Sequence, residues 1–335
     1  MLTKRILLGH GSGGRLTHNL IKEVLLKKLN NPILRELSDS AVIDYKEKIA
    51  FTTDSFVVSP LFFPGGDIGK LAVTGTLNDL VMLGAIPEYL SLALIMEEGL
   101  DQAILEKIIS SISFYAKKSG VSIVTGDTKV VERGAVDKLF INTSGIGRLV
   151  SAKRLGLKNI APRDLIIITG NIAEHGLSVL AKRKELDLGF NIKSDCNPLN
   201  GLIIPLLKKC PGVKFMRDPT RGGVATTLNE VAEGTNLGVV IHEKDIPVSA
   251  KVRVACELLG IDPLYVANEG KALLVVEPKE AARIVRFLRR HPLGRRSKII
   301  GEIVKEPQGR LLLRTVFNAE RVLDMLTAQT LPRIC

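Results

Sequence analysis

The stretch that decides the fold is residues 70–83, KLAVTGTLNDLVML. Apolar residues recur along it at helical spacing, which predicts a buried helix. Its centre, Thr76-Leu-Asn-Asp-Leu80, recurs as Thr227-Leu-Asn-Glu-Val231, and the two asparagines stand 229 − 78 = 151 residues apart. A five-residue echo fits chance as well as duplication, but the elements around each copy also follow one another in a similar order. We therefore expect two related α/β blocks packed together.

Strands and helices alternate on both sides of this helix. Apolar runs in the first block predict strands at 48–58, 89–96, 121–125 and 139–148 and helices at 70–83 and 100–118. The second block reads as strands at 165–169, 238–241 and 272–276 and helices at 177–186, 223–233, 252–259 and 279–290. A short strand at 4–8 and a helix at 16–29 precede both blocks.

The pattern divides the chain into five predicted segments. They are an N-terminal glycine-loop segment and helix at 1–40, a first α/β domain at 41–150, a linker at 151–163, a second α/β domain at 164–309, and a mobile tail at 310–335. Gly156 and Pro162 mark the linker, and periodicity is lost toward the end of the tail.

Composition excludes several classes of protein. A chain of 335 residues with 45% hydrophobic and 24% charged residues is globular and is long enough for two domains. The net charge, 47 − 35 = +12, favours anionic ligands such as phosphates, whereas aromatic residues at 4% and the absence of Trp argue against nucleic acid. No apolar run approaches the roughly 20 residues that span a bilayer. Without an export signal or a CxxC pair, we expect reduced thiols in a cytoplasm.

A glycine cluster at 9–14, GHGSGG, lies between the first predicted strand and helix. It satisfies GxGxxG, with Asp39 some 25 residues later, so dinucleotide binding is one interpretation. A structural turn is another. We favour a flap over phosphates in which Ser12, Gly13 and Gly14 approach the anion, because glycine lets backbone N–H groups come close.

Four aspartates each adjoin a predicted core element: Asp39, Asp54, Asp79 and Asp127. A carboxylate beside a buried run is costly unless it is paired or bound to a cation. Each one alone is typical of a cap or a turn, but four in one block suggest a shared Mg²⁺-polyphosphate site, since magnesium prefers oxygen ligands.

Three further polar motifs have both a structural and a functional interpretation. Lys129 stands two residues after Asp127, beyond the predicted strand, and it is either a surface lysine or a group that holds a transferred phosphoryl. Asn268-Glu-Gly-Lys271 is the matching polar turn of the second block. Pro219-Thr-Arg-Gly-Gly223 precedes a helix and is either an anion site or a capped loop.

The sequence resembles the HypE family of hydrogenase maturation proteins, within the superfamily of aminoimidazole ribonucleotide (AIR) synthetase and selenophosphate synthetase. The resemblance covers essentially the whole chain, and the terminal Pro332-Arg-Ile-Cys335 separates this family from its superfamily relatives. The other motifs that carry it are GHGSGGR (9–15), TDS (53–55), GTLNDL (75–80), GDTK (126–129), PTRGG (219–223) and NEGK (268–271).

The resemblance implies a fold, a reaction and partners. The fold is α/β with α+β layering: two related PurM-like domains, each a mixed sheet packed with helices, form a homodimer through the sheets of the first domains. HypF would carbamoylate the thiol of Cys335, ATP with Mg²⁺ would drive dehydration of the S-carboxamide to a thiocyanate, and cyanide would pass to iron on a HypC–HypD complex. Two alternatives are a relative that activates a free small molecule and a nucleotide-gated docking module.

Site residues follow from the same resemblance. Cys335 is the carrier, Glu269 the general base and Lys129 a group that bears on the developing charge. The nucleotide ligands are Ser12, Gly13, Gly14, Asp54, Asn78, Asp79, Asp127 and Thr128, and the magnesium ligands are Asp39, Asp54, Asp79 and Asp127.

Overall fold

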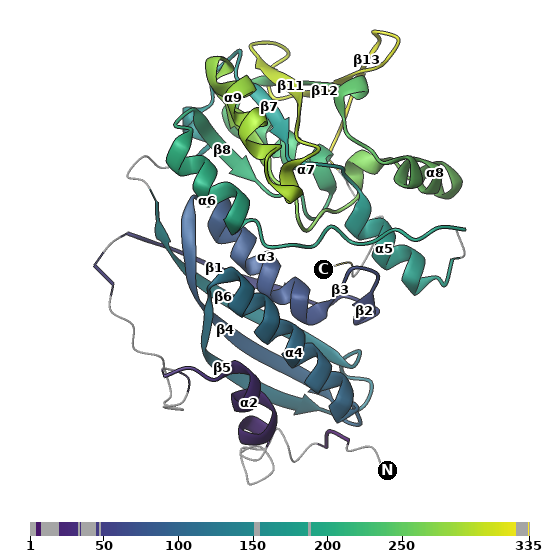
Figure 1. The fold of residues 1–335 in the computed structure, drawn as a ribbon. Coiled ribbons are helices and arrows are strands. Elements are labelled where there is room, and N and C mark those ends of the chain that lie inside the picture. Colours follow the sequence, from purple (N-terminus) through teal and green to yellow (C-terminus); the bar gives the residue numbers. More distant parts are fainter. Residues whose placement is uncertain are drawn as a thin grey trace.

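A computed structural model describes residues 5–7, 20–32, 34, 45–46, 48–150, 155–186, 189–325 and 334. Two sheets with their helices form two units, stacked one above the other in Figure 1. The first unit has a four-stranded sheet in the order β1 (Ile49–Phe56), β6 (Leu139–Leu149), β4 (Ala85–Glu97), β5 (Ser122–Val131). Helices α3 (Ile68–Met82) and α4 (Gln102–Ser119) cover one face of this sheet.

The second unit has a seven-stranded sheet. Its order is β13 (Glu320–Val322), β12 (Leu311–Arg314), β9 (Gly238–His242), β11 (Lys298–Val304), β7 (Leu165–Ile168), β10 (Leu273–Val276), β8 (Val213–Arg217). Its helices are α5 (Glu174–Arg183), α6 (Asn200–Lys209), α7 (Gly223–Thr235), α8 (Ala250–Leu259) and α9 (Pro278–Leu288).

Smaller elements complete the described chain. A π-helical turn (Ile21–Leu25) leads into α2 (Leu26–Leu29), and β2 (Phe62–Phe63) pairs with β3 (Gly66–Asp67). Short 3-10 turns lie at Leu157–Asn159, Glu243–Asp245, Pro263–Tyr265 and Pro292–Gly294. None of the helices within the described ranges combines the length and apolarity needed to cross a bilayer.

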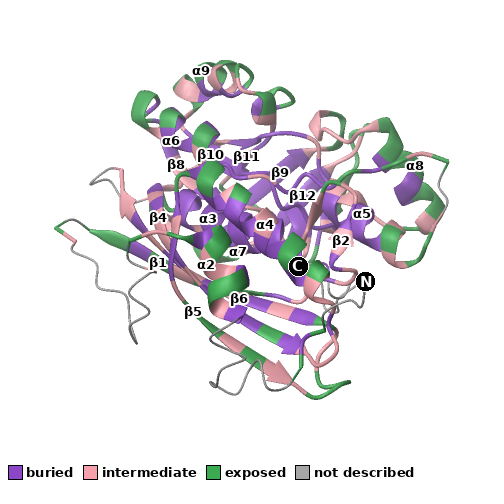
Figure 2. Ribbon diagram, turned by 60° about the horizontal axis from the view of Figure 1, so that its bottom comes forward, coloured by how far each residue is buried: buried purple, intermediate pink, exposed green. Residues whose placement is uncertain are grey.

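Helix α3 is the centre of the molecule. Asp67 caps its N-terminus by accepting hydrogen bonds from the backbone N–H groups of Gly69 and Lys70. Every residue of α3 except Asp79 is buried, because the helix lies between its own sheet and the second unit, where it contacts α6 and β8 (Figures 1 and 2). A helix with no solvent-facing stripe is the form expected for a core element. Asp79, the one carboxylate of the helix, is therefore also its one residue that is not fully buried.

Most of the predicted elements are confirmed, within a few residues at their ends. The predicted strand at 4–8 is wrong in its described part, where Arg5 makes only a single bridge to Asp101. The tail predicted from residue 310 is also corrected, since β12 pairs with β9 and β13 with β12, and both belong to the second sheet. Leu311–Leu313 is buried there, and this burial holds the segment in place.

One correction bears on the site. Residues 126–129 were predicted to follow the strand at 121–125, but they lie inside β5, which continues to Val131. β5 is an edge strand paired only with β4 among the described residues, and one side of it faces solvent. Polar and charged residues are tolerated in such a strand, so polarity does not end it.

Candidate active site

A group of carboxylates gathers where α3 meets the second unit. Asp54 lies on the helix-facing side of β1, Asp79 on α3, Asp218 just after β8, and Glu269 in the turn before β10. Thr52 Oγ1 donates a hydrogen bond to Asp79 Oδ2 at 3.0 Å. The four acids are close enough for their charges to act on one another.

Burial and mutual repulsion raise the pKa values of these acids. Burial, then the charge of Asp54, raises the pKa of Asp79 to about 6. Burial, then the charge of Asp79, raises the pKa of Asp218 to about 7. Burial followed by the charges of four other carboxylates, Asp218 first, holds the pKa of Glu269 well above its usual range. A site that resists negative charge in this way favours either protons or a bound cation.

Asp218 is a site residue that the sequence analysis missed. It stands directly before the motif at 219–223 and after β8, so its position next to a buried strand was the available signal. The motif at this position begins one residue earlier than predicted, at Asp218. Arg217 and Arg221 bring positive charge to the group: Arg217 acts on Asp79, and Arg221 acts on Asp54.

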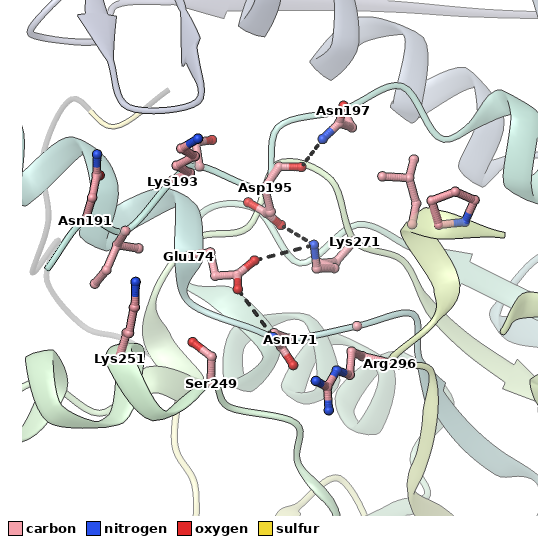
Figure 3. Close-up of a pocket in the computed structure, with 15 residues that line it drawn as sticks. Asn171, Glu174, Asn191, Lys193, Asp195, Asn197, Ser249, Lys251, Lys271 and Arg296 are labelled. Atoms are coloured by element: carbon pink, nitrogen blue, oxygen red, sulfur yellow. Dashed lines mark hydrogen bonds and ion pairs between the residues drawn. The ribbon is translucent and has the colours of Figure 1, made fainter.

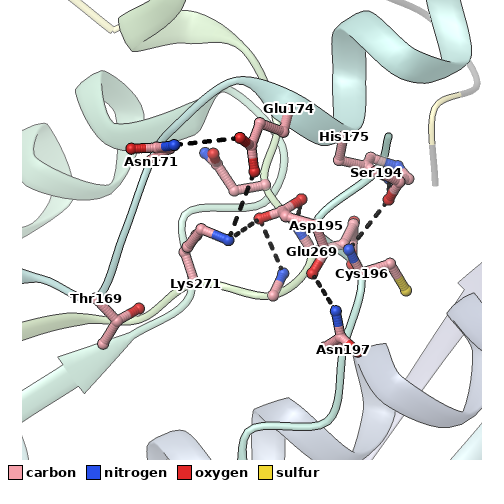
Figure 4. A network of polar contacts seen from close by, with 12 residues as sticks. Thr169, Asn171, Glu174, His175, Ser194, Asp195, Cys196, Asn197, Glu269 and Lys271 are labelled. Atoms are coloured by element: carbon pink, nitrogen blue, oxygen red, sulfur yellow. Dashed lines mark hydrogen bonds and ion pairs between the residues drawn. The ribbon is translucent and has the colours of Figure 1, made fainter. Parts of the chain in front are cut away.

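The turn that carries Glu269 is fixed by its backbone. Asp195 accepts hydrogen bonds from the N–H groups of Glu269 (3.2 Å) and Gly270 (3.3 Å). The same carboxylate forms an ion pair with Lys271 Nζ at 3.2 Å, as Figure 4 shows. A Cβ on Gly270 would come within 1.9 Å of the carbonyl oxygen of Asp195, so only glycine fits there.

Asn268 holds the same turn from the other side. Its Oδ1 accepts a hydrogen bond from the N–H of Ala173 at 2.7 Å, and its Nδ2 donates to the carbonyls of Pro219 and Val266, both at 3.0 Å. These buried bonds connect the turn to the loop that contains Asp218. The backbone of Glu269 is thus held from both sides of the turn.

Asn78, a predicted nucleotide ligand, makes three hydrogen bonds inside the protein. Its Nδ2 donates to the carbonyls of Glu269 (3.2 Å) and Asn197 (3.1 Å), and its Oδ1 accepts from the N–H of Leu199 (2.9 Å). Both amide protons are therefore used inside the protein. The residue ties α3 of the first unit to the turn and to the segment 197–199 of the second.

The residues of the GDTK motif lie apart from the acids within one chain. Asp127 pairs with Ala93 of β4, and both face away from α3, whereas Asp54 faces α3. β1 and β5 are opposite edges of the sheet, and three strand spacings of about 4.8 Å separate them by about 14 Å. Within one chain, Asp54 therefore lies with Asp79, whereas Asp127 lies on the other face of the sheet and at its opposite edge.

The open face of β5 presents two charges to solvent. The Asp127 side chain is 61% exposed, and its Oδ2 lies 3.5 Å from Lys129 Nζ. Lys129 pairs with Ile95 of β4 and points to the same face. Thr128 alternates with them, pairs with Leu94 of β4 and points to the opposite face of the sheet.

Several predicted site residues lie outside the described residues: Ser12, Gly13, Gly14, Asp39 and Cys335. The neighbour of Cys335 is described. Ile334 is 3% exposed, and its carbonyl oxygen lies 2.6 Å from Nε2 of the buried His175.

The donor set of the acidic group fits a hard cation. Asp54, Asp79 and Asp218 offer carboxylate oxygens, which Mg²⁺ prefers. Within the described ranges, no three His, Cys, Asp or Glu side chains are already arranged as a metal site. The raised pKa values show that such charges are unfavourable there without a counter-charge.

A cavity of about 590 Å³ lies in the second unit beside the Glu269 turn (Figure 3). Lys271 Nζ reaches from its wall between Asp195 (3.2 Å) and Glu174 (4.0 Å). Lys193, Lys251 and Arg296 also line it. The ion pair that fixes the turn is thus part of the cavity wall.

Comparisons with known proteins agree with this architecture. Residues 37–149 match the family "AIR synthase related protein, N-terminal domain", and residues 161–314 match its C-terminal domain. A protein of Cupriavidus necator named carbamoyl dehydratase HypE is 45% identical over 333 residues, which cover 99% of this chain and 95% of the relative.

Two solved structures are also similar. A crystal structure of the hydrogenase maturation protein HypE in complex with ATP is 44% identical, with a TM-score of 0.96 over 98% of this chain and 100% of that one. A structure of a HypE–HypF complex contains a chain that is 45% identical, with a TM-score of 0.81 over 92% of this chain and 99% of that one.

Proposed function

This chain belongs to the HypE family of carbamoyl dehydratases, among the AIR-synthase-related proteins, and on that premise we propose that it dehydrates a carboxamide carried on Cys335. ATP would drive the reaction, and the product would be a protein thiocyanate. The group would then serve as a cyanide ligand of the iron in a [NiFe] hydrogenase.

One observation carries the proposal. The segment 194–197 joins the end of the chain to the buried acid: Ser194 bonds to His175, which holds the carbonyl of Ile334. Asp195, the next residue, holds the backbone of Glu269. Cys335 follows Ile334 directly in the sequence, and Ile334 is the residue whose carbonyl His175 holds.

The chemistry needs a better leaving group than hydroxide. The amide oxygen attacks the γ-phosphorus of ATP, ADP leaves, and one N–H proton is lost. The phosphorylated oxygen then departs as phosphate while the second N–H proton is removed, which closes the C≡N bond. The sum is S-carboxamide plus ATP to thiocyanate, ADP, phosphate and a proton, so the elements of water end in phosphate.

Glu269 is the proposed acceptor of the second proton. Its raised pKa makes it a strong base once it is ionised, and Arg217 and Arg221 supply positive charge to the neighbouring Asp79 and Asp54. Asp54 and Asp79, with Asp218, would hold Mg²⁺, which neutralises phosphate charge when bound. Most of the catalysis in phosphoryl transfer is positioning of this kind.

A homodimer would bring Lys129 and Asp127 to this site. The open face of the first sheet exposes Phe51 (65%), Ile49 and Ile95, which is apolar surface that a second copy can cover. If two such sheets close on one another with β1 of one beside β5 of the other, the Asp127 and Lys129 of the second copy come close to the strand that carries Asp54. We propose that each site is built from two chains.

The proposed partners are the donor of the carbamoyl group and the acceptor of the cyanide. HypF would donate the carbamoyl group, as the structure of a HypE–HypF complex suggests, and a HypC–HypD complex would accept cyanide. The three described cysteines, Cys196, Cys210 and Cys256, are free, buried thiols, which agrees with a reducing cytoplasm.

Mass spectrometry of the C-terminal peptide tests the function. Protein carbamoylated on Cys335 should lose one water when Mg-ATP is added, and Glu269→Gln should bind ATP but retain the carboxamide. Cys335→Ser is the matched control and should show no change. ATP turnover that survives deletion of residues 334–335 would instead indicate a free small-molecule substrate, and ATP binding with no change at the thiol would indicate a docking module.

A further inference from the structure

His175 is a fully buried, ionisable side chain that the reaction above does not use. It is the second residue of α5 and bonds through both ring nitrogens. Nδ1 lies 2.8 Å from Ser194 Oγ, and Nε2 lies 2.6 Å from the carbonyl oxygen of Ile334. Phe63 of β2 packs edge-on against the ring, with centroids 5.4 Å apart. The ring therefore has a single orientation.

The hydrogen bonds fix which nitrogen carries the proton. Burial lowers the pKa of His175, so the ring is neutral and has one N–H. A carbonyl oxygen can only accept, so Nε2 must donate to Ile334. Nδ1 then accepts the hydroxyl proton of Ser194, whose oxygen in turn accepts from the N–H of Cys196 at 3.1 Å. This relay of donors makes His175 a prepared donor toward the end of the chain.

Ser194 is itself held by backbone. Its N–H donates to the carbonyl of Pro64 at 2.7 Å, and Ser178 Oγ of α5 donates to the same oxygen at 2.8 Å. The relay is thus anchored in both units, since Pro64 lies in the β2–β3 hairpin and Ser194 in the second unit. The position of His175 Nε2 is therefore set by these contacts and not by the bond to Ile334.

The partner of this donor has an anchor of its own. The side chain of Ile334 belongs to the hydrophobic core. Its apolar side chain supplies affinity, and its carbonyl bond to Nε2 supplies orientation, because a hydrogen bond is directional and burial is not.

We propose that His175 is a positioning residue that docks the chain end through the carbonyl of Ile334 and so aims the thiol of Cys335. The aiming of the thiol rests on the proposed function, because it assumes that Cys335 carries the reacting group. The docking of Ile334 does not depend on that reaction. His175 and Glu269 are fixed by adjacent residues, Ser194 and Asp195. One short segment therefore sets the distance between the docked chain end and the proposed base.

Thiol alkylation of the full-length protein tests the docking. The probe is iodoacetamide, and the reading is the rate at which Cys335 is modified without nucleotide or carbamoyl donor. Burial raises the pKa of Cys196, Cys210 and Cys256, so these thiols stay unreactive, and peptide mass spectrometry confirms the site. His175→Phe keeps the ring but removes the donor, and should raise the rate roughly fivefold, as loss of one hydrogen bond predicts.

Three further variants make the test decisive. His175→Gln offers an amide N–H and should restore most of the slow rate, while His291→Phe, at a histidine that accepts from Leu293 N–H, should leave it unchanged. Ile334→Ser removes the apolar anchor at the chain end, where folding is not at stake, and should also raise the rate. Equal rates in His175→Phe and wild type, or in Ile334→Ser and wild type, overturn the proposal.

The outcome is separable from the proposed function. Fast alkylation in His175→Phe with no loss of water from carbamoylated wild type would keep the docking and reject the dehydration. Dehydration at the wild-type rate in His175→Phe would show that the docking does not aim the thiol, and would reject the positioning role while leaving the reaction in place.

Discussion

The side-chain amide of Asn78 donates a hydrogen bond to the backbone carbonyl of Glu269 at 3.2 Å, across 191 residues of sequence. The bond joins the central helix of one unit to the turn that carries the proposed base of the other. Two more bonds from the same amide, to Asn197 and Leu199, make the junction rigid. Asn78 therefore contributes both to the relative position of the units and to the position of the proposed base.

Asn78→Leu tests this junction. The change leaves the carbonyls of Glu269 and Asn197 and the N–H of Leu199 without partners, and should lower the free energy of unfolding by about 2–4 kcal/mol. Urea denaturation measures the loss. Asn229→Leu is the matched control, since that amide of α7 bonds to Ala225 and Leu323, both within the second unit. It should cost similar stability but leave dehydration per folded molecule intact; equal activity losses would contradict the assignment.

The acidic group predicts how stability depends on pH. Folding raises the pKa values of Asp79, to about 6, and Asp218, to about 7, so the folded state holds protons that the unfolded state has released. Stability from this source is complete below the unfolded pKa near 4 and is lost as pH rises through 6 and 7. With EDTA, the melting temperature should fall between pH 5 and pH 8, and saturating Mg²⁺ should reduce that fall.

Asp79→Asn is the control for the pH experiment. It removes a charge that burial disfavours, so the variant should melt at a higher temperature than wild type at pH 8 and show a shallower pH dependence. Wild-type pH dependence in this variant would mean that another group is responsible.

Gly270 should not tolerate a side chain. The Cβ of Gly270→Ala would meet three backbone atoms of residues 195–197 at 1.9–3.0 Å, and backbone cannot move aside cheaply. We expect the turn to shift and dehydration to fall at least about tenfold, because small misplacements of a catalytic group are costly. Gly156→Ala, whose Cβ would meet nothing within 4 Å, should behave as wild type. A fully active Gly270→Ala would show that the turn need not be rigid.

Lys129 should matter for the reaction and not for the fold. Its side chain is 62% exposed and its ion pair with Asp127 is on the surface, so Lys129→Ala should change the free energy of unfolding by less than about 0.5 kcal/mol. Dehydration should fall strongly. A variant that is both stable and fully active would remove Lys129 from the mechanism.

The fold was largely predictable, and its errors have physical reasons. Periodicity located α3 because a helix that is apolar on all sides leaves a long uninterrupted signal. The sequence pattern placed the end of β5 at Thr125, too early, because an edge strand with a solvent-facing side can carry charged residues such as Asp127 and Lys129 as readily as a loop can. β11 and α6 were not predicted: β11 contains Gly301 and α6 contains Pro205, and both residue types argue against an element when only the sequence is read.

The site was predictable in its chemistry and not in its geometry. Asp54, Asp79 and Glu269 were identified by type and motif, and the structure brings them together. That Asn78 ties two units, or that Asp218 faces Asp79, depends on contacts between distant segments, which no local pattern encodes.

The sheet that separates Asp54 from Asp127 has a genetic consequence. If each catalytic centre draws one acid from each of two chains, a mutated chain inactivates only the centre to which it contributes the altered residue. Asp54→Asn and Lys129→Ala, each inert alone, would regain activity when their subunits are mixed and allowed to exchange. Such complementation between two defective alleles would reveal the shared centre without any structure of the pair.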